Sequence, residues 1–213
     1  MRGKWIVGVV LLAGVLGISV GVAVAQFRRA PSAAGPIVGA PDVSWAAGSR
    51  IAPAFVLNEQ TGQPVSLASL RGRTVIVTFI DPLCRNFCPL EANVLNMVVA
   101  ELPAAERPVI IAVSVNQWGN SRADLAADRQ RWRLGPQWHW AIGDPAALAS
   151  VWHKYGIEVL ATKKTLAGVT VHEITHTEAA YVIDPSGHER ALFMWPFSAS
   201  DVERTIRSVQ QPS

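Results

Sequence analysis

Long runs of apolar residues alternate with mixed apolar and polar stretches along the chain. Val75–Ile80 and Pro108–Val115 are rich in β-branched and apolar residues, a pattern typical of parallel strands that are buried on both faces. Between these two runs, the apolar positions recur with a helical period. They predict a helix from Cys88 to about Leu102, with an apolar face formed by Leu90, Val94, Leu95, Val98 and Val99.

The rest of the chain continues this alternation of strand and helix signals. Phe55–Leu57 and Val65–Leu67 predict short strands, whereas residues 158–175 predict an irregular, exposed excursion. Later elements are a helix capped by Ser121 and Asp124 that runs through Arg133, a strand at Trp138–Ile142, a helix from Asp144-Pro145 to about Tyr155, strands at Ala179–Ile183 and Glu189–Phe193, and a helix capped by Ser200 and Glu203 that runs to about Ser208. This order predicts an α/β sandwich with a mixed central sheet.

The amino-terminal part has a different pattern. Residues 5–25 carry no charge and are long enough to cross a bilayer. We expect a signal anchor at residues 1–29, with a cytoplasmic N-terminus and the domain on the extracytoplasmic side. An A-x-A pattern that ends at Ala25 leaves open the alternative of cleavage after Ala25 and secretion. Basic residues flank the run on both sides, so the charge rule alone does not decide the orientation.

Composition separates a tether from a domain and excludes one class of function. Residues 30–49 are small and rich in Pro and Gly, which predicts a flexible tether before a domain at residues 50–213. Arg2 and Lys4 account for two of the 19 basic residues. The other basic residues nearly balance the 16 acidic residues, so the chain after the apolar run is close to neutral. We find no basic stripe with interleaved aromatic residues, so nucleic-acid binding is excluded.

The candidate chemistry lies where the first long strand turns into a helix. Cys84 and Cys88 are the only cysteines and lie four residues apart, a spacing that lets both sulfurs face the same way and form a disulfide. A helix N-terminus favours negative charge, so we expect both thiols to ionise more readily than free cysteine. Two thiolates suit Cu(I), Zn or reversible disulfide chemistry. The alternatives are a structural disulfide or two inert buried cysteines.

A copper site also needs a nitrogen donor, and the chain has five histidines. His176 lies just before the strand at Ala179–Ile183, and His172 shares its face if the segment is extended. His139, His153 and His188 are interpreted as packing or surface residues. His176 is therefore the candidate third ligand.

The sequence Val75-Ile-Val-Thr-Phe-Ile-Asp-Pro-Leu-Cys84-Arg-Asn-Phe-Cys88-Pro89 resembles the metal-binding motif of the SCO/SenC family. The resemblance continues through Ile111–Val115, Trp152–Gly156 and His176–Gly187. It implies a thioredoxin-like three-layer α/β/α sandwich with a mixed central sheet, preceded by a transmembrane helix. It also implies that Cys84, Cys88 and His176 are copper ligands. One departure is Asn116, where the family usually has an acidic loop, and another is Asp81-Pro82 before the first cysteine.

The resemblance implies a membrane-tethered copper metallochaperone that carries Cu(I) or Cu(II). Its partners would be the copper-bearing subunit of cytochrome c oxidase, or another copper-site protein, and a thiol–disulfide reductant. The main alternative is a thiol–disulfide oxidoreductase, in which Cys84 and Cys88 form a redox-active pair without a metal. Whether the chain is an enzyme stays open at this point. A peroxidase is disfavoured because the dithiol turn does not provide the separate activating setting that a peroxidatic cysteine needs.

Overall fold

The computed structural model describes residues 40–211 of the chain. The predicted anchor at residues 1–29, the cleavage position after Ala25 and the first half of the predicted tether, residues 30–39, lie outside this range. Within residues 40–211, no helix combines the length and apolarity needed to cross a membrane. The anchor therefore stays a prediction.

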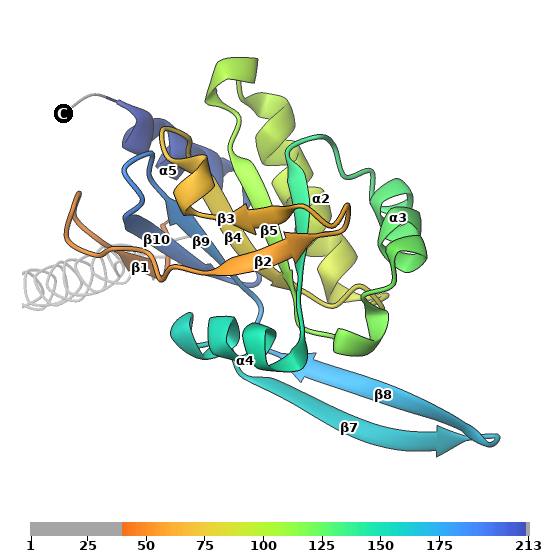
Figure 1. Cartoon of the computed structure of the whole chain (residues 1–213). Helices are drawn as coiled ribbons and strands as arrows, with labels where there is room; N and C mark the ends of the chain where they lie inside the picture. The colour runs from red at the N-terminus through yellow and green to blue at the C-terminus, as the bar shows by residue number, and fades with distance from the viewer. Residues whose placement is uncertain (1–39, 212–213) are drawn as a thin grey trace, which may run out of the picture. The chain divides into compact units, whose positions relative to one another are not determined.

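Eight strands form one sheet in the order β1-β10-β9-β4-β5-β6-β2-β3 (Figure 1). They are β1 (Val43–Ser44), β2 (Val56–Glu59), β3 (Pro64–Ser66), β4 (Val75–Ile80), β5 (Val109–Ser114), β6 (Trp138–Ile142), β9 (Ala179–Ile183) and β10 (Glu189–Met194). β4, β5 and β6 run parallel to one another, and the other pairings are antiparallel. The predicted mixed central sheet is confirmed.

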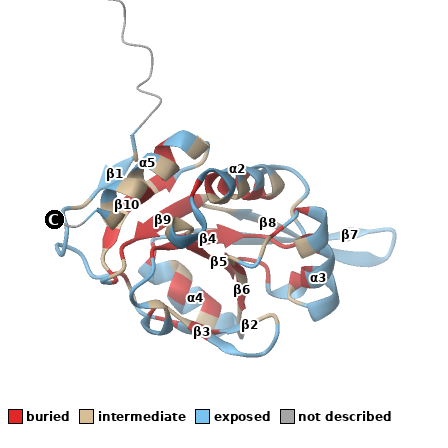
Figure 2. Cartoon of the chain, turned by 90° about the horizontal axis from the view of Figure 1, so that it is seen from above, coloured by how far each residue is buried: buried red, intermediate tan, exposed pale blue. Residues whose placement is uncertain are grey.

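Helices cover both faces of this sheet (Figure 2). They are α2 (Phe87–Glu101), α3 (Arg122–Arg131), α4 (Pro145–Lys154) and α5 (Ala199–Gln210), with short 3-10 helices η1 (Ala68–Leu70), η2 (Ala104–Glu106) and η3 (Gln117–Gly119). α2, α3 and α5 pack on one face, and α4 packs on the other. Every residue of β4 is buried because successive side chains alternate between the two cores, Ile76 with α2 and Val77 with α4.

The helix caps follow the sequence signals at two of three sites. Ser121 and Asp144 accept hydrogen bonds from the backbone N–H groups that begin α3 and α4. The third cap is Ser198 rather than the predicted Ser200, because Ser198 Oγ accepts from the Asp201 N–H. Both serines have an acidic residue three positions later, so the pattern fits either, and the earlier one begins α5.

The sequence suggested that residues 158–175 are irregular, and this prediction is wrong. They contain most of a β-hairpin. β7 (Val159–Leu166) pairs with β8 (Val169–His176) in a separate two-stranded ribbon that projects from the domain (Figure 1). Most of its side chains are exposed, so it lacks the apolar alternation by which a half-buried strand is recognised. Ala167 and Gly168 have positive φ angles of 50° and 81°, as a two-residue hairpin turn requires.

The folded part also begins before the predicted boundary at residue 50. β1 lies within the expected tether and pairs with β10, with Val43 opposite Leu192. Trp45 extends this contact, since its backbone N–H donates to Arg190 O at 3.0 Å. A two-residue strand is too short to produce a recognisable alternation of apolar and polar positions.

Candidate metal centre and dithiol

The turn between β4 and α2 holds the two cysteines. Asp81 shapes it: its side chain accepts from Leu83 N–H at 2.8 Å, and its carbonyl accepts from Cys84 N–H at 3.0 Å. This local hydrogen bonding is typical of Asp at a turn. Cys84 is half-buried in the turn, whereas Cys88 lies in the first turn of α2 and is fully buried against the sheet.

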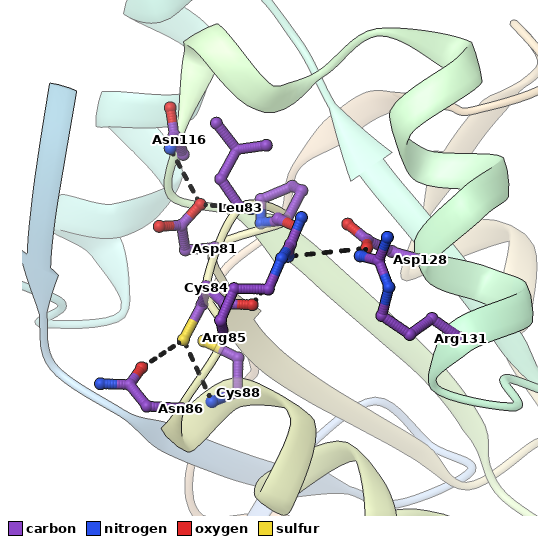
Figure 3. Close-up of polar contacts among 10 residues, drawn as sticks. Asp81, Leu83, Cys84, Arg85, Asn86, Cys88, Asn116, Asp128 and Arg131 are labelled. Carbon is purple, nitrogen blue, oxygen red and sulfur yellow. Dashed lines mark hydrogen bonds and ion pairs between the residues drawn. The ribbon is translucent and has the colours of Figure 1, made fainter. Parts of the chain in front are cut away.

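The Cys84 sulfur lies next to the backbone amide of Cys88. Figure 3 shows Cys84 Sγ between the Asn86 side chain, with Oδ1 at 2.8 Å, and the Cys88 N–H, which donates to it across 3.4 Å. Both cysteines are free thiols. Arg85 braces the turn by donating to the carbonyls of Pro82 and Cys84, and its guanidinium lies 3.6 Å from Asp128.

The expectation that both thiols ionise easily is correct for one of them. A hydrogen bond from the Cys88 side chain lowers the pKa of Cys84 to about 6, and it outweighs the opposing effect of burial. The same contact, together with burial, raises the pKa of Cys88 well above its usual value. Two neighbouring thiols share one proton between them, so ionisation is favoured at only one of the two, the more exposed Cys84.

His176 reaches this turn from the end of β8. Its Nε2 lies 3.8 Å from Cys88 Sγ, and its Nδ1 lies 3.0 Å from the Thr177 carbonyl. A carbonyl can only accept, so Nδ1 carries the hydrogen and Nε2 presents its lone pair toward the sulfur. Burial lowers the pKa of His176, which favours the neutral imidazole. A neutral ring held by its second nitrogen is the usual arrangement of a metal-ligating histidine.

The sheet brings these remote segments together. β9 pairs antiparallel with β4, with Thr78 opposite Ala180. The segment that enters β9, which includes His176 and Glu178, therefore runs beside the segment that leaves β4 toward Cys84. This register is the physical reason that a histidine far along the chain faces the dithiol.

The structure also places Glu178, which sequence reasoning missed, beside the dithiol. One ligand atom each from Cys88, His176 and Glu178 lies within 4.8 Å of the other two. Burial, aided by the neighbouring Cys84 charge, raises the pKa of Glu178 to about 7. The spacing was available as a signal, because residues two apart in an extended segment point to the same side. Cys84 is the predicted ligand that lies outside this trio.

The loop that contains Asn116 lies next to the same turn. Asn116 is buried and its Nδ2 donates to Asp81 Oδ1 at 2.9 Å (Figure 3). Trp118 follows in η3, and its ring stacks on His172, with centroids 3.7 Å apart and planes 5° apart. His172 is therefore engaged by the Trp118 ring and is not one of the three residues whose ligand atoms cluster.

The other histidines are remote from the site, in agreement with their predicted packing or surface roles. His139 contacts Glu59, His188 contacts Ser186, and His153 lies in the last turn of α4. The site itself opens into a groove of about 1000 Å³ between the β4–α2 turn and β8. Cys84, His176 and Glu178 line this groove, whereas Cys88 is buried behind it, so ligands can reach the first three from solvent.

Glu91 is a buried carboxyl group on α2 and lies one turn beyond Cys88. Thr78 Oγ1 donates to its Oε1, while no partner of Oε2 is found among residues 40–211. Burial is the main cause that raises the pKa of Glu91 to about 8.

The fold and site define a mixed α/β protein that carries a dithiol and an imidazole where the central strand β4 ends. The SCO1/SenC family model matches residues 44–211, and the chain belongs to that family. No curated protein matches the sequence.

Similar solved structures have the same fold at low sequence identity. ScoI of Bradyrhizobium japonicum, solved with copper bound, is 21% identical, with a TM-score of 0.61 over 75% of this chain and 99% of that one. Yeast Sco1 with copper bound is 17% identical, with a TM-score of 0.64 over 75% and 87%. BsSco is described as a Sco-family cytochrome c oxidase assembly protein with a disulfide switch. It is 18% identical, with a TM-score of 0.63 over 82% and 99%.

Proposed function

We propose that this chain is a copper metallochaperone of thioredoxin-like fold in which Cys84, Cys88 and His176 bind the metal. The observation that carries the proposal is the imidazole. His176 Nε2 lies 3.8 Å from Cys88 Sγ, with its other nitrogen bonded to a carbonyl. Two donors with bonds of about 2.0 and 2.3 Å to one ion stand roughly 3.5–3.8 Å apart, so this spacing suits ligands of a common metal.

The donor set also fits copper chemically. Thiolates hold Cu(I), and the imidazole supplies the nitrogen that Cu(II) prefers. Cys84 provides a thiolate near neutral pH, because its pKa is lowered to about 6. Cys88 would give up its proton when the metal binds, since a thiol must be deprotonated to act as a ligand.

The recipient we propose is the binuclear copper site of a respiratory haem-copper oxidase. This step rests on family membership and on the description of BsSco as a member of a family of cytochrome c oxidase assembly proteins. The proposed setting is the extracytoplasmic face of a membrane, with residues 1–29 as anchor and residues 30–39 as tether. Secretion after cleavage at Ala25 is the alternative.

The test is the affinity of the reduced full-length chain for Cu(I) and Cu(II) in competition titrations. His176→Ala should lower copper affinity at least about tenfold, roughly 1.4 kcal/mol, and more for Cu(II) than for Cu(I). His172→Ala is the matched control, because it removes an imidazole that stacks on Trp118 and for which no contact with either sulfur is found among residues 40–211. Wild-type affinity of His176→Ala for both copper states would overturn the proposal.

A thiol–disulfide oxidoreductase is the second candidate, and the different settings of the two cysteines favour it. Cys84 is accessible with a lowered pKa, and Cys88 is buried behind it, as in an attacking and a resolving thiol. The disulfide switch described in BsSco is consistent with such chemistry. If the chain is an oxidoreductase, His176→Ala should reduce disulfides at the wild-type rate. The oxidoreductase becomes the preferred function if copper binding does not need His176.

A further inference from the structure

Glu178 lies beside the proposed thiol and imidazole ligands and has a ligand atom within 4.8 Å of theirs. From this geometry we infer that the Glu178 carboxylate is an additional copper ligand, which supplies an oxygen donor to the Cu(II) form of the site. The inference rests on the proposed function, because it concerns the same copper site. It adds a ligand to the set of Cys84, Cys88 and His176.

Elimination among the acidic side chains of the groove singles out Glu178. Asp81, Glu173 and Glu178 line it. Asp81 already accepts hydrogen bonds from Leu83 and Asn116, and Glu173 forms an ion pair with Lys164. Within residues 40–211, no hydrogen bond or ion pair of the Glu178 carboxylate is found. A half-buried carboxylate without a partner loses hydration without compensation, and a bound cation would provide that compensation.

The backbone holds Glu178 firmly in this position. Thr177 N–H donates to the Glu158 carbonyl at 2.9 Å, and Trp195 N–H donates to the Glu178 carbonyl at 3.0 Å. Ala179, the next residue, begins β9 and is buried. The carboxylate therefore projects from a segment fixed on both sides, and a ligand held in this way needs little reorganisation when the ion binds.

The oxygen donor distinguishes the two oxidation states of copper. Soft thiolates favour Cu(I), whereas Cu(II) prefers a tetragonal set that includes nitrogen and oxygen. Cys88, His176 and Glu178 provide one sulfur, one nitrogen and one oxygen, and Cys84 adds a second sulfur from the adjoining turn. Glu178 should thus stabilise Cu(II) selectively and lower the reduction potential of the bound copper.

The test compares Glu178→Gln with wild type in the full-length chain. Gln keeps the size of the side chain and removes the charged oxygen donor. Cu(II) affinity should fall about tenfold and Cu(I) affinity should change less than about twofold. This difference raises the one-electron potential by about 59 mV. The Cu(II) electron paramagnetic resonance spectrum should change as well. Glu178→Asp retains a carboxylate, so its Cu(II) affinity should lie between those of Glu178→Gln and wild type.

Glu173→Gln is the matched control, because it neutralises another carboxylate of the same groove that is paired with Lys164. It should leave both affinities and the spectrum unchanged. The inference is overturned if Glu178→Gln keeps the wild-type Cu(II) affinity, potential and spectrum, or if it weakens both copper states equally. If His176→Ala loses copper while Glu178→Gln binds as wild type, the proposed function stands and only the inference fails. A wild-type chain that binds no copper overturns both.

Discussion

At the scale of single residues, the hydrogen bond between the two thiols, together with the deeper burial of Cys88, gives the two cysteines opposite properties. Cys84 is half-exposed and receives hydrogen bonds, so its thiolate is favoured, whereas Cys88 has no exposed surface and keeps its proton. The sequence predicted the pair and its position but not this asymmetry. Spacing alone does not tell which sulfur faces the core.

The asymmetry predicts a distinct pH profile for alkylation of the reduced, copper-free chain. The rate at Cys84 should rise with a midpoint near pH 6, because the thiolate is the nucleophile and its pKa is lowered to about 6. Cys88→Ala removes the hydrogen bond that mainly lowers this pKa, so the midpoint should move toward roughly 8.5. Iodoacetamide labelling followed by mass spectrometry measures both. A wild-type midpoint at 8 or above would contradict the asymmetry.

Glu91 predicts a pH dependence of folding stability. Its pKa is raised to about 8 in the folded chain, so between about pH 4.5 and 8 the folded state binds more protons than the unfolded state. The stability contributed by Glu91 is therefore present at low pH and is lost as pH rises, by up to about 1.4 kcal/mol per pH unit. Glu91→Gln should remove this loss.

Denaturant unfolding of the full-length chain at pH 5 and pH 8 measures the effect as the difference between Glu91→Gln and wild type. The variant should gain relative to wild type as pH rises, and the comparison cancels the titration of groups that do not interact with Glu91. Glu101→Gln, at the exposed end of the same helix, should show no such gain. If the free energy of unfolding changed with pH in the same way for Glu91→Gln and wild type, Glu91 would be excluded as the cause of the pH dependence.

At the scale of elements, the strongly patterned segments were predictable and the weakly patterned ones were not. β4 and β5 follow from continuous apolar runs, and α4 follows from its Asp144 cap and Pro145. The β7–β8 hairpin was missed because both of its faces carry polar residues and its turn is Ala-Gly rather than Asn-Gly. The placement of Glu178 depends on the β4–β9 register, which the sequence does not specify.

The contact between the ends of β4 and β5 provides a prediction about the loop that departs from the family pattern. Asn116 donates to Asp81 where both side chains are buried. Asn116→Asp would place two carboxylates at this distance, so it should lower the free energy of unfolding by about 1–3 kcal/mol at pH 7. The loss should shrink at pH 5, where one carboxyl group can hold a proton. Chemical denaturation at the two pH values measures it.

Asn93→Asp is the control for Asn116→Asp, because Asn93 is exposed on α2 and the same change there should cost less than about 0.5 kcal/mol. An equal effect of the two variants would show that the Asn116–Asp81 hydrogen bond is not important for stability.

At the scale of the whole molecule, the site is assembled from two distant segments on a rigid sheet. Residues 81–88 leave β4, and residues 176–178 enter its neighbour β9. The donors therefore keep their spacing only while the sheet is intact, and the groove beside them faces solvent along β8. Under the proposed function, this openness would let the site accept and release an ion without unfolding, which a chaperone requires and a buried structural site does not provide.

The proposed membrane setting gives the last prediction. Residues 5–25 lack charge and are long enough to span a bilayer, so the full-length chain should stay in the membrane fraction after washing with carbonate. Protease added to intact spheroplasts should digest the domain, because we place it outside the cytosol. A mature chain that begins at Gln26 would instead establish cleavage and release. A domain that resists protease until the membrane is opened would place the dithiol in the cytosol, where cysteines are kept reduced.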